Sequence, residues 1–170
     1  IWFLPGTTKL HVRVATTADV DDGIWGSVKS LPLNAITNVR VETFGRDIFL
    51  YLNNSLDSMA SLSADRIFGA ASRYSSDPWW SLAQATISSI QMKSVSTMTL
   101  KIASSFSGSL SKLAVYERTT VPANFSLSFT IKPFGTVSEL ASIIHYCKNK
   151  TDLGEGGRMP GIYLKLQQPN

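Results

Sequence analysis

The stretch ITNVRVETFGRDIFLYLN, residues 36–53, decides the fold expected for this chain. The turn in its middle contains Gly45. On both sides of the turn, residues expected to face inward alternate with polar or aromatic residues. The residues expected to face inward are Val39, Val41, Thr43, Ile48, Leu50 and Leu52. Alternation with period two around a short Gly-containing turn indicates a β-hairpin. Because such strands bury one face only, they are typical of antiparallel sheets that pack as a sandwich.

Similar alternation recurs along the chain. The clearest run is FSLSFTIK, residues 125–132, which places four apolar side chains on one face. In the run LHVRV, residues 10–14, the same rule turns His11 outward, and we expect a surface histidine there. Further strands are expected at 1–4, 66–71, 85–92, 98–102, 113–117, 137–147 and 161–166, with a flexible Ser/Gly stretch at 104–111. Since no amphipathic helix longer than about three turns is visible, we predict an all-β, two-sheet antiparallel sandwich.

Length and composition restrict the class of protein. The 170 residues fit one domain with a sizeable core, and 44% hydrophobic residues exclude a disordered chain. The net charge of +4 comes from scattered basic residues, so we expect no nucleic-acid partner. No apolar run is long enough to cross a bilayer, so we expect no membrane insertion. Abundant Ser and Thr with few Lys and Glu favour an extracellular protein.

Two kinds of residue bear on that location. The single cysteine, Cys147, excludes an internal disulfide and is either a small buried hydrophobe or a bond to another chain. Three N-x-S/T sequons without proline begin at Asn53, Asn124 and Asn149. Each falls at an expected strand end or loop, so we predict glycans on at least one of the three.

Two loops contain candidate binding residues. Asp19, Asp21 and Asp22 lie within four residues, and closely spaced carboxylates are possible Ca²⁺ ligands, although the spacing of a helix-loop-helix calcium site is missing. The alternative is a solvated acidic loop. A second loop carries three aromatic residues, Tyr74, Trp79 and Trp80, which would stack on a sugar if exposed or belong to the core if buried.

Several of these segments together resemble a known family, the concanavalin A-like, laminin G-like sandwich domains. The segments FSLSFTIKPFGTVSELASIIHY (125–146) and GGRMPGIYL (156–164) are similar to the opening half of such a domain. The segments KLHVRV (9–14), NAITNVRVETFGRDIFLYLNN (34–54), YSSDPWW (74–80) and ATISSIQM (85–92) are similar to its closing half. The resemblance implies a jelly-roll, laminin G-like sandwich whose halves stand in permuted order: residues 1–92 closing, 93–124 bridging and 125–170 opening.

The two ends of the chain look like versions of one strand. They are Ile1, Trp2, Phe3 and Leu4 at one end and Ile162, Tyr163 and Leu164 at the other. The chain therefore looks like a unit cut through the same strand of successive copies in a tandem array. Alternatively, it is a circular permutant that closes on itself. In the first case these residues would lie against a neighbouring copy, and head-to-tail contacts that do not close generate a filament.

Catalysis is not expected. Hydrolases of this superfold need two carboxylates about 5 Å apart, which alternation would place two or four residues apart on one strand. Glu42 and Glu117 each stand alone on their strands. No phosphate loop, metal-ligand cluster or nucleophile set is visible. We expect an extracellular structural subunit that assembles with copies of itself by sharing strands. The alternative is a monomeric, lectin-like module that binds a carbohydrate or a protein.

Overall fold

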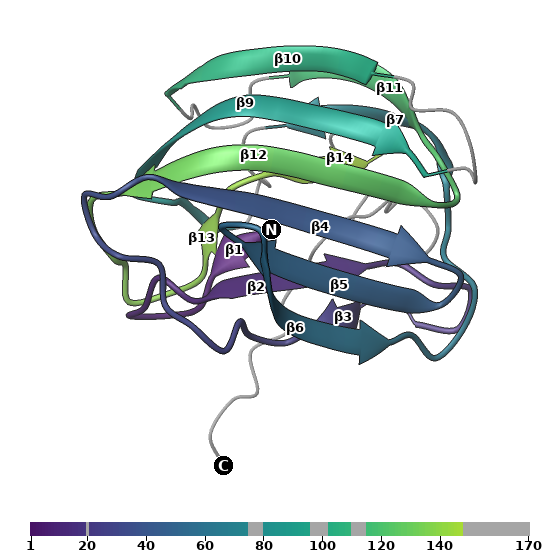
Figure 1. The fold of residues 1–170 in the computed structure, drawn as a ribbon, viewed down its shortest axis with the longest axis horizontal. Coiled ribbons are helices and arrows are strands. Elements are labelled where there is room, and N and C mark those ends of the chain that lie inside the picture. The colour runs from purple at the N-terminus through teal and green to yellow at the C-terminus, as the bar shows by residue number, and fades with distance from the viewer. Residues whose placement is uncertain (20, 75–79, 96–101, 110–114, 148–170) are drawn as a thin grey trace.

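The protein is all-β. The computed structural model describes residues 1–19, 21–74, 80–95, 102–109 and 115–147, and none of these residues is helical. Within these ranges fourteen strands form three sheets, of six, five and three strands. Figure 1 shows the six-stranded sheet as a front layer, with the two smaller sheets behind it.

The front layer is antiparallel throughout and contains the expected hairpin. Val41 pairs with Leu50, so the faces expected to point inward on the two strands lie side by side. The last long strand is inserted between two earlier ones. In spatial order the strands are β10 (Ile102–Ser109), β9 (Ala85–Ser94), β12 (Phe125–Pro133), β4 (Thr37–Phe44), β5 (Asp47–Leu52) and β6 (Ser55–Ser61).

The back layer is made of shorter strands. The five-stranded sheet runs β3 (Asp22–Ile24), β2 (Leu10–Val14), β1 (Trp2–Phe3), β13 (Ala141–Ser142) and β8 (Ser81–Leu82). The three-stranded sheet runs β11 (Val115–Val121), β7 (Gly69–Tyr74) and β14 (His145–Cys147). Only β13 and β8 pair in parallel among the described strands.

The core lies between the layers. The inward faces predicted for β4, β5 and β12 are confirmed, because every second residue of these strands is buried. From the back layer, β2 adds its apolar side chains to the same cluster. The largest fully buried apolar side chains are Trp2, Phe3, Ile1, Leu10, Ile48, Leu50, Ile87, Ile131, Leu140, Ile143 and Ile144.

Two tight turns hold β4, β5 and β6 in register. Gly45 takes φ +56° at the first turn position between β4 and β5, as a type II′ turn requires. Asn53 and Asn54 take φ +49° and +65° between β5 and β6, the combination of a type I′ turn. Asparagine tolerates this left-handed conformation better than other residues with a Cβ, which explains the Asn-Asn pair.

Some sequence-based expectations were wrong. The stretch expected to be flexible between Ser104 and Ser111 belongs largely to β10, because it pairs with β9. The strand expected at 66–71 begins only at Gly69 and continues to Tyr74. The expected strand 137–147 divides into β13 and β14, which join different sheets. The expected strand 161–166 lies outside the described residues.

A charge placed on the inner face of β4 should unfold the protein. Val41 is buried in the core, so Val41→Asp would bury a carboxylate without a partner. We expect a loss of at least about 3 kcal/mol in the free energy of unfolding, measured by urea denaturation. Asn38→Asp, on the exposed face of the same strand, is the control and should change little. Normal stability of Val41→Asp would contradict this placement of the core.

Candidate binding surface

The outer face of the six-stranded sheet is the most distinctive described surface, and one half of it is apolar. Phe49 pairs with Met59, and Tyr51 pairs with Leu56, so these four side chains lie beside one another on β5 and β6. Met59 is 57% exposed and Leu56 is 53% exposed, while the two aromatic rings are half-buried. We call these four residues the β5–β6 patch. Interaction sites in other proteins are rich in exposed apolar clusters, so this patch is a candidate contact surface.

The other half of the outer face is a polar hollow of about 260 Å³ over β4, β12 and β9. Its lining offers amide and hydroxyl groups that donate and accept hydrogen bonds: Asn38, Asn54, Gln91, Ser89, Ser128 and Thr130. Such groups recognise polar ligands rather than apolar ones.

Arg40 forms the border between the two halves. Its guanidinium lies 4.1 Å from the centroid of the Tyr51 ring, and its Nη1 donates to Glu42 at 2.9 Å. Arg40 Nε is buried and has no hydrogen-bond partner among the described residues. A buried polar atom without a partner is unfavourable, so this Nε adds a local energetic cost at the edge of the hollow.

A β-bulge shapes the floor of the hollow. Ile87 and Ile90 both point into the core although they are three residues apart, which a regular strand does not permit. The extra residue is accommodated at Ser89, which takes φ +55°. The pairing between β9 and β12 shifts at this point. A residue other than glycine in the left-handed region stores strain, and such strain is concentrated at binding sites.

The three aspartates proposed as Ca²⁺ ligands each bind a different partner. Asp21 pairs with Arg13 at 3.1 Å, and Asp22 accepts hydrogen bonds from the backbone and hydroxyl of Ser63. Asp19 accepts from the backbone N–H of Asp21 within its own turn. No group of three metal-ligating side chains occurs in the described part of the chain. The structure therefore does not bring these carboxylates together.

The predicted aromatic stacking residues separate in the same way. Tyr74 is buried near His145, so it is not available to a ligand. Trp80 is partly buried against the core, and Trp79 lies outside the described residues. The most exposed tryptophan described is Trp25 (62%), which no pattern in the sequence had indicated.

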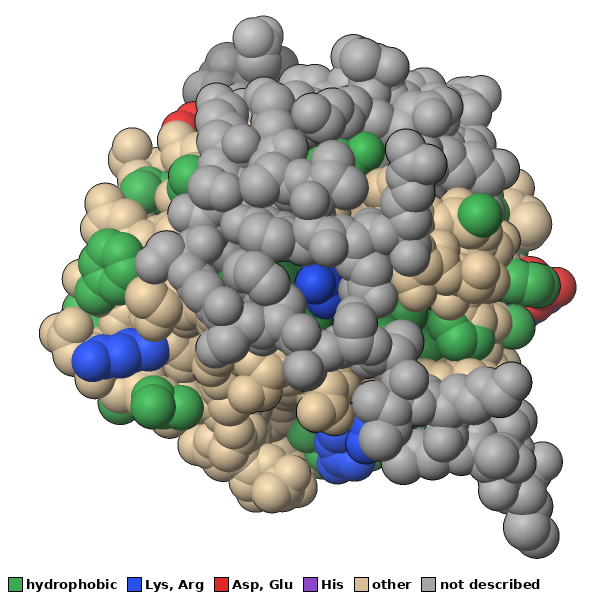
Figure 2. Space-filling view, turned by 90° about the horizontal axis from the view of Figure 1, so that it is seen from above, with side chains coloured by type: hydrophobic (Ala, Val, Ile, Leu, Met, Phe, Trp, Pro, Cys, Tyr) green, Lys and Arg blue, Asp and Glu red, His purple; other side chains and the backbone are tan. Residues whose placement is uncertain are grey.

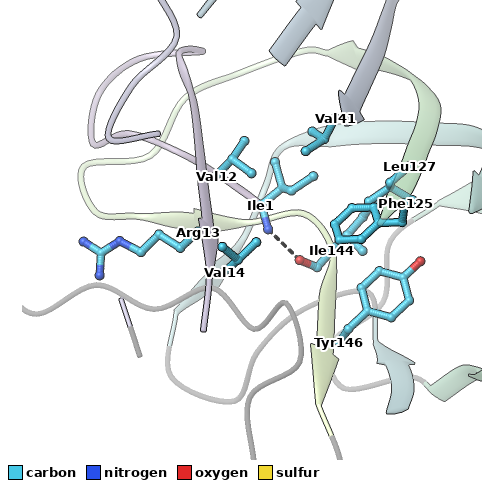
Figure 3. A pocket seen from close by; sticks show the side chains of 9 residues that line it. All are labelled: Ile1, Val12, Arg13, Val14, Val41, Phe125, Leu127, Ile144 and Tyr146. Carbon is cyan, nitrogen blue, oxygen red and sulfur yellow. Dashed lines mark hydrogen bonds between the residues drawn. The ribbon is translucent and has the colours of Figure 1, made fainter. Parts of the chain in front are cut away.

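The N-terminal segment expected to lie against a neighbour is already buried in its own chain. Trp2 pairs with His11 of β2 on one side and with Ser142 of β13 on the other. The N-terminal amino group of Ile1 donates to the carbonyl oxygen of Ile144 at 2.6 Å, and Figure 3 marks this hydrogen bond with a dashed line. The space around Ile1 is a cavity of only about 10 Å³, which is no ligand site. Residues 162–164 lie outside the described residues, so the assembly of Ile1–Leu4 with a neighbour stays a prediction.

His11 does not face solvent as predicted; it is fully buried, because the outer face of β2 is covered as well as the inner one. Arg13, 1% exposed, donates from Nε to His11 Nε2 at 2.7 Å, and His11 Nδ1 therefore carries the proton donated to the Trp25 carbonyl at 2.9 Å. The guanidinium of Arg13 lies 3.9 Å from the centroid of the Trp25 ring. In Figure 3 Arg13 extends away from the apolar cluster around Ile1.

Two of the three predicted glycosylation sites fall on described residues. Asn53 lies in the exposed turn between β5 and β6, and its Oδ1 accepts the backbone N–H of Asn38 at 2.9 Å. Asn124 precedes β12 and is partly buried. Asn149 lies outside the described residues.

Charged side chains are scattered on the face of the molecule seen in Figure 2. In the view from the β10 edge, Lys and Arg side chains are isolated among uncharged and apolar ones (Figure 2). Within the described ranges there is also no helix with the length and apolarity needed to cross a membrane. Comparisons with protein families, with curated proteins and with solved structures find no match for this chain.

The buried histidine should make stability depend on pH. Burial lowers the pKa of His11 from 6.5 to about 3; the hydrogen bond to the Trp25 carbonyl opposes this and the charge of Arg13 adds to it. The unfolded chain therefore binds a proton below pH 6.5 that the folded chain does not bind until about pH 3. We expect the free energy of unfolding to fall by up to about 1.4 kcal/mol per pH unit in this window.

Urea unfolding at pH 7.5 and pH 5 measures this effect. His11→Gln keeps a hydrogen-bonding side chain but does not titrate, so it should lose about 2 kcal/mol less than the wild type between these two pH values. Equal pH dependence in the two proteins would show that His11 is not held neutral.

Proposed function

We propose that this protein is an extracellular, non-catalytic structural subunit that assembles with copies of itself. We further propose that its fold is a laminin G-like jelly roll with permuted halves, which the resemblance of residues 9–14, 34–54 and 125–146 supports. The antiparallel sheets and the core between them are compatible with that fold. The Ser- and Thr-rich composition supports the extracellular location.

The observation that carries the assembly proposal is the β5–β6 patch beside an unpaired edge. No described strand pairs with the outer edge of β6. Strand edges are normally protected by Lys, Pro or outward charges, but the sequence of β6, SLDSMAS, contains a single charged residue, Asp57. Its carboxylate is engaged by the backbone N–H groups of Val28 and Lys29 at 2.8 and 3.1 Å.

A head-to-tail contact fits these edges. The opposite edge of the same sheet is β10, so β6 of one copy would lie beside β10 of the next and extend the sheet by main-chain hydrogen bonds. A contact between two different surfaces of identical subunits does not close on itself and generates a filament. Exchange of the segment 1–4 between copies remains a further form of strand sharing, since β1 occupies a place between β2 and β13 that the same strand of a neighbour would fit.

Charging the patch should abolish assembly without unfolding the subunit. Met59→Lys places an ammonium at the centre of the proposed contact, whereas Ile36→Lys charges an even more exposed apolar residue outside the patch. Light scattering and electron microscopy of the secreted protein should show assemblies for the wild type and for Ile36→Lys. Met59→Lys should yield folded monomers. A wild type that stays monomeric at high concentration would refute the proposal.

A second candidate function is glycan binding in the polar hollow. The amides of Asn38, Asn54 and Gln91 suit the hydroxyl groups of a sugar. Aromatic carbon next to them, on Tyr51, suits its apolar face. Glu42, the acidic residue at the border, is neutralised by Arg40 and has no second carboxylate paired across from it on β5 or β12, so binding without hydrolysis is proposed.

Glycan-array binding tests this candidate. Gln91→Ala removes a hydrogen-bonding side chain from the hollow and should weaken binding of a positive glycan at least about tenfold, which corresponds to about 1.4 kcal/mol. Met59→Lys is the control outside the hollow and should bind normally. Recovery of a cleaved glycan would contradict the non-catalytic assignment.

A further inference from the structure

The end of the sandwich near Asn124 has features that the assembly proposal does not use. The side chain of Asn124 is held in one orientation: its Oδ1 accepts the backbone N–H of Gly45 at 3.1 Å and Nη2 of Arg66 at 2.9 Å. Arg66 is itself buried and fixed, because it also donates to the Thr43 hydroxyl at 2.6 Å and to the Gly45 carbonyl at 3.0 Å. An amide whose oxygen is bound on two sides presents its nitrogen in a defined direction.

That nitrogen is available. Asn124 Nδ2 has no hydrogen bond to the described residues and is not among their buried unpartnered atoms. Beside it lies an open hollow of about 230 Å³, which is lined by Phe68 and Ala123 and bordered by the ion pair between Arg46 and Asp65 at 2.9 Å. Phe68 is 56% exposed although it borders buried residues of the chain. Nothing in the described part of the chain explains an exposed ring next to a directed amide nitrogen.

The sequence around Asn124 indicates a modification that would use this nitrogen. Asn124-Phe125-Ser126 is an acceptor for N-linked sugars. We propose that Asn124 carries an N-linked glycan and that its first sugar packs in the hollow, with an apolar face on Phe68 and its polar groups toward Arg46 and Asp65. The glycan thus becomes part of the folded structure at this end of the sandwich.

The reaction is an ordinary amide glycosylation. A bond forms between Asn124 Nδ2 and the anomeric carbon of the sugar. The bond from that carbon to the diphosphate of a lipid-linked oligosaccharide donor breaks, the lipid diphosphate leaves and the amide loses one proton. Because Oδ1 remains in the product, its hydrogen bonds with Gly45 and Arg66 are kept.

Asn53 differs from Asn124 in its surroundings. It has the same sequon chemistry and a bound Oδ1, but it lies in the turn between β5 and β6 and does not line a described hollow. A glycan at Asn53 would therefore project into solvent. The two sites form a matched pair, since only the sugar at Asn124 should affect stability.

The inference rests on the extracellular location proposed above, and its test does not depend on self-assembly. The full chain is expressed through the secretory pathway of a eukaryotic host, and glycopeptide mass spectrometry measures occupancy at Asn124. Ser126→Ala removes this sequon and leaves the Asn124 side chain intact, whereas Ser55→Ala removes the sequon of Asn53. We expect thermal unfolding of Ser126→Ala about 2–4 °C below the wild type, and no change for Ser55→Ala.

Three further measurements separate the sugar from the mutation. Trimming with an endoglycosidase that leaves the first sugar should not change the unfolding temperature. Ser126→Ala should have no effect in a Phe68→Ala or Phe68→Leu background, and none in protein made without glycans in bacteria. An unoccupied Asn124 would overturn the proposal. So would an equal effect of Ser126→Ala in bacterial protein, because the loss would then come from the weak Ser126 hydrogen bond to Glu42 at 3.3 Å.

Discussion

Burial of the inner face of β12 is the interaction on which the rest of the structure depends. Phe125, Leu127, Phe129 and Ile131 are all nearly inaccessible, and together they contribute about 6–12 kcal/mol of hydrophobic free energy before ordering costs. The same strand pairs with β4 on one side and with β9 on the other. Without β12 the six-stranded sheet would separate into two pieces, and its outer face would not exist as one surface.

A second constraint comes from the back layer, where β2 is buried on both faces. Burying His11 and Arg13 is tolerable because the histidine stays neutral and each of its ring nitrogens has a partner. The arrangement also positions Trp25, whose ring lies against the guanidinium of Arg13. Polar groups here stabilise a particular geometry of the back layer and simultaneously make it sensitive to acid.

The candidate sites are unequally visible in the sequence. Alternation alone places Phe49 and Tyr51 on the outer face, but β6 was not predicted because a bulge near Asp57 shifts its pairing with β5 and leaves SLDSMAS without a regular pattern. The bulge at Ser89 has a signal, the three-residue spacing of Ile87 and Ile90. The hollow beside Asn124 has no signal in the sequence, since Phe68 and Asn124 are 56 positions apart in the chain and only folding makes them neighbours.

By itself the sequence determined the strand content of residues 36–53 and 125–132 and the side chains that these strands bury. Side-chain direction in a strand is a local property with a period of two residues, so it can be read without knowing the neighbours. Only the tertiary structure decided that β12 lies between β4 and β9, that Trp2 pairs with His11, and that His11 is buried instead of exposed. Strand order and the covering of the second face of a strand depend on contacts between residues that are distant in the sequence. A local pattern therefore does not reveal them.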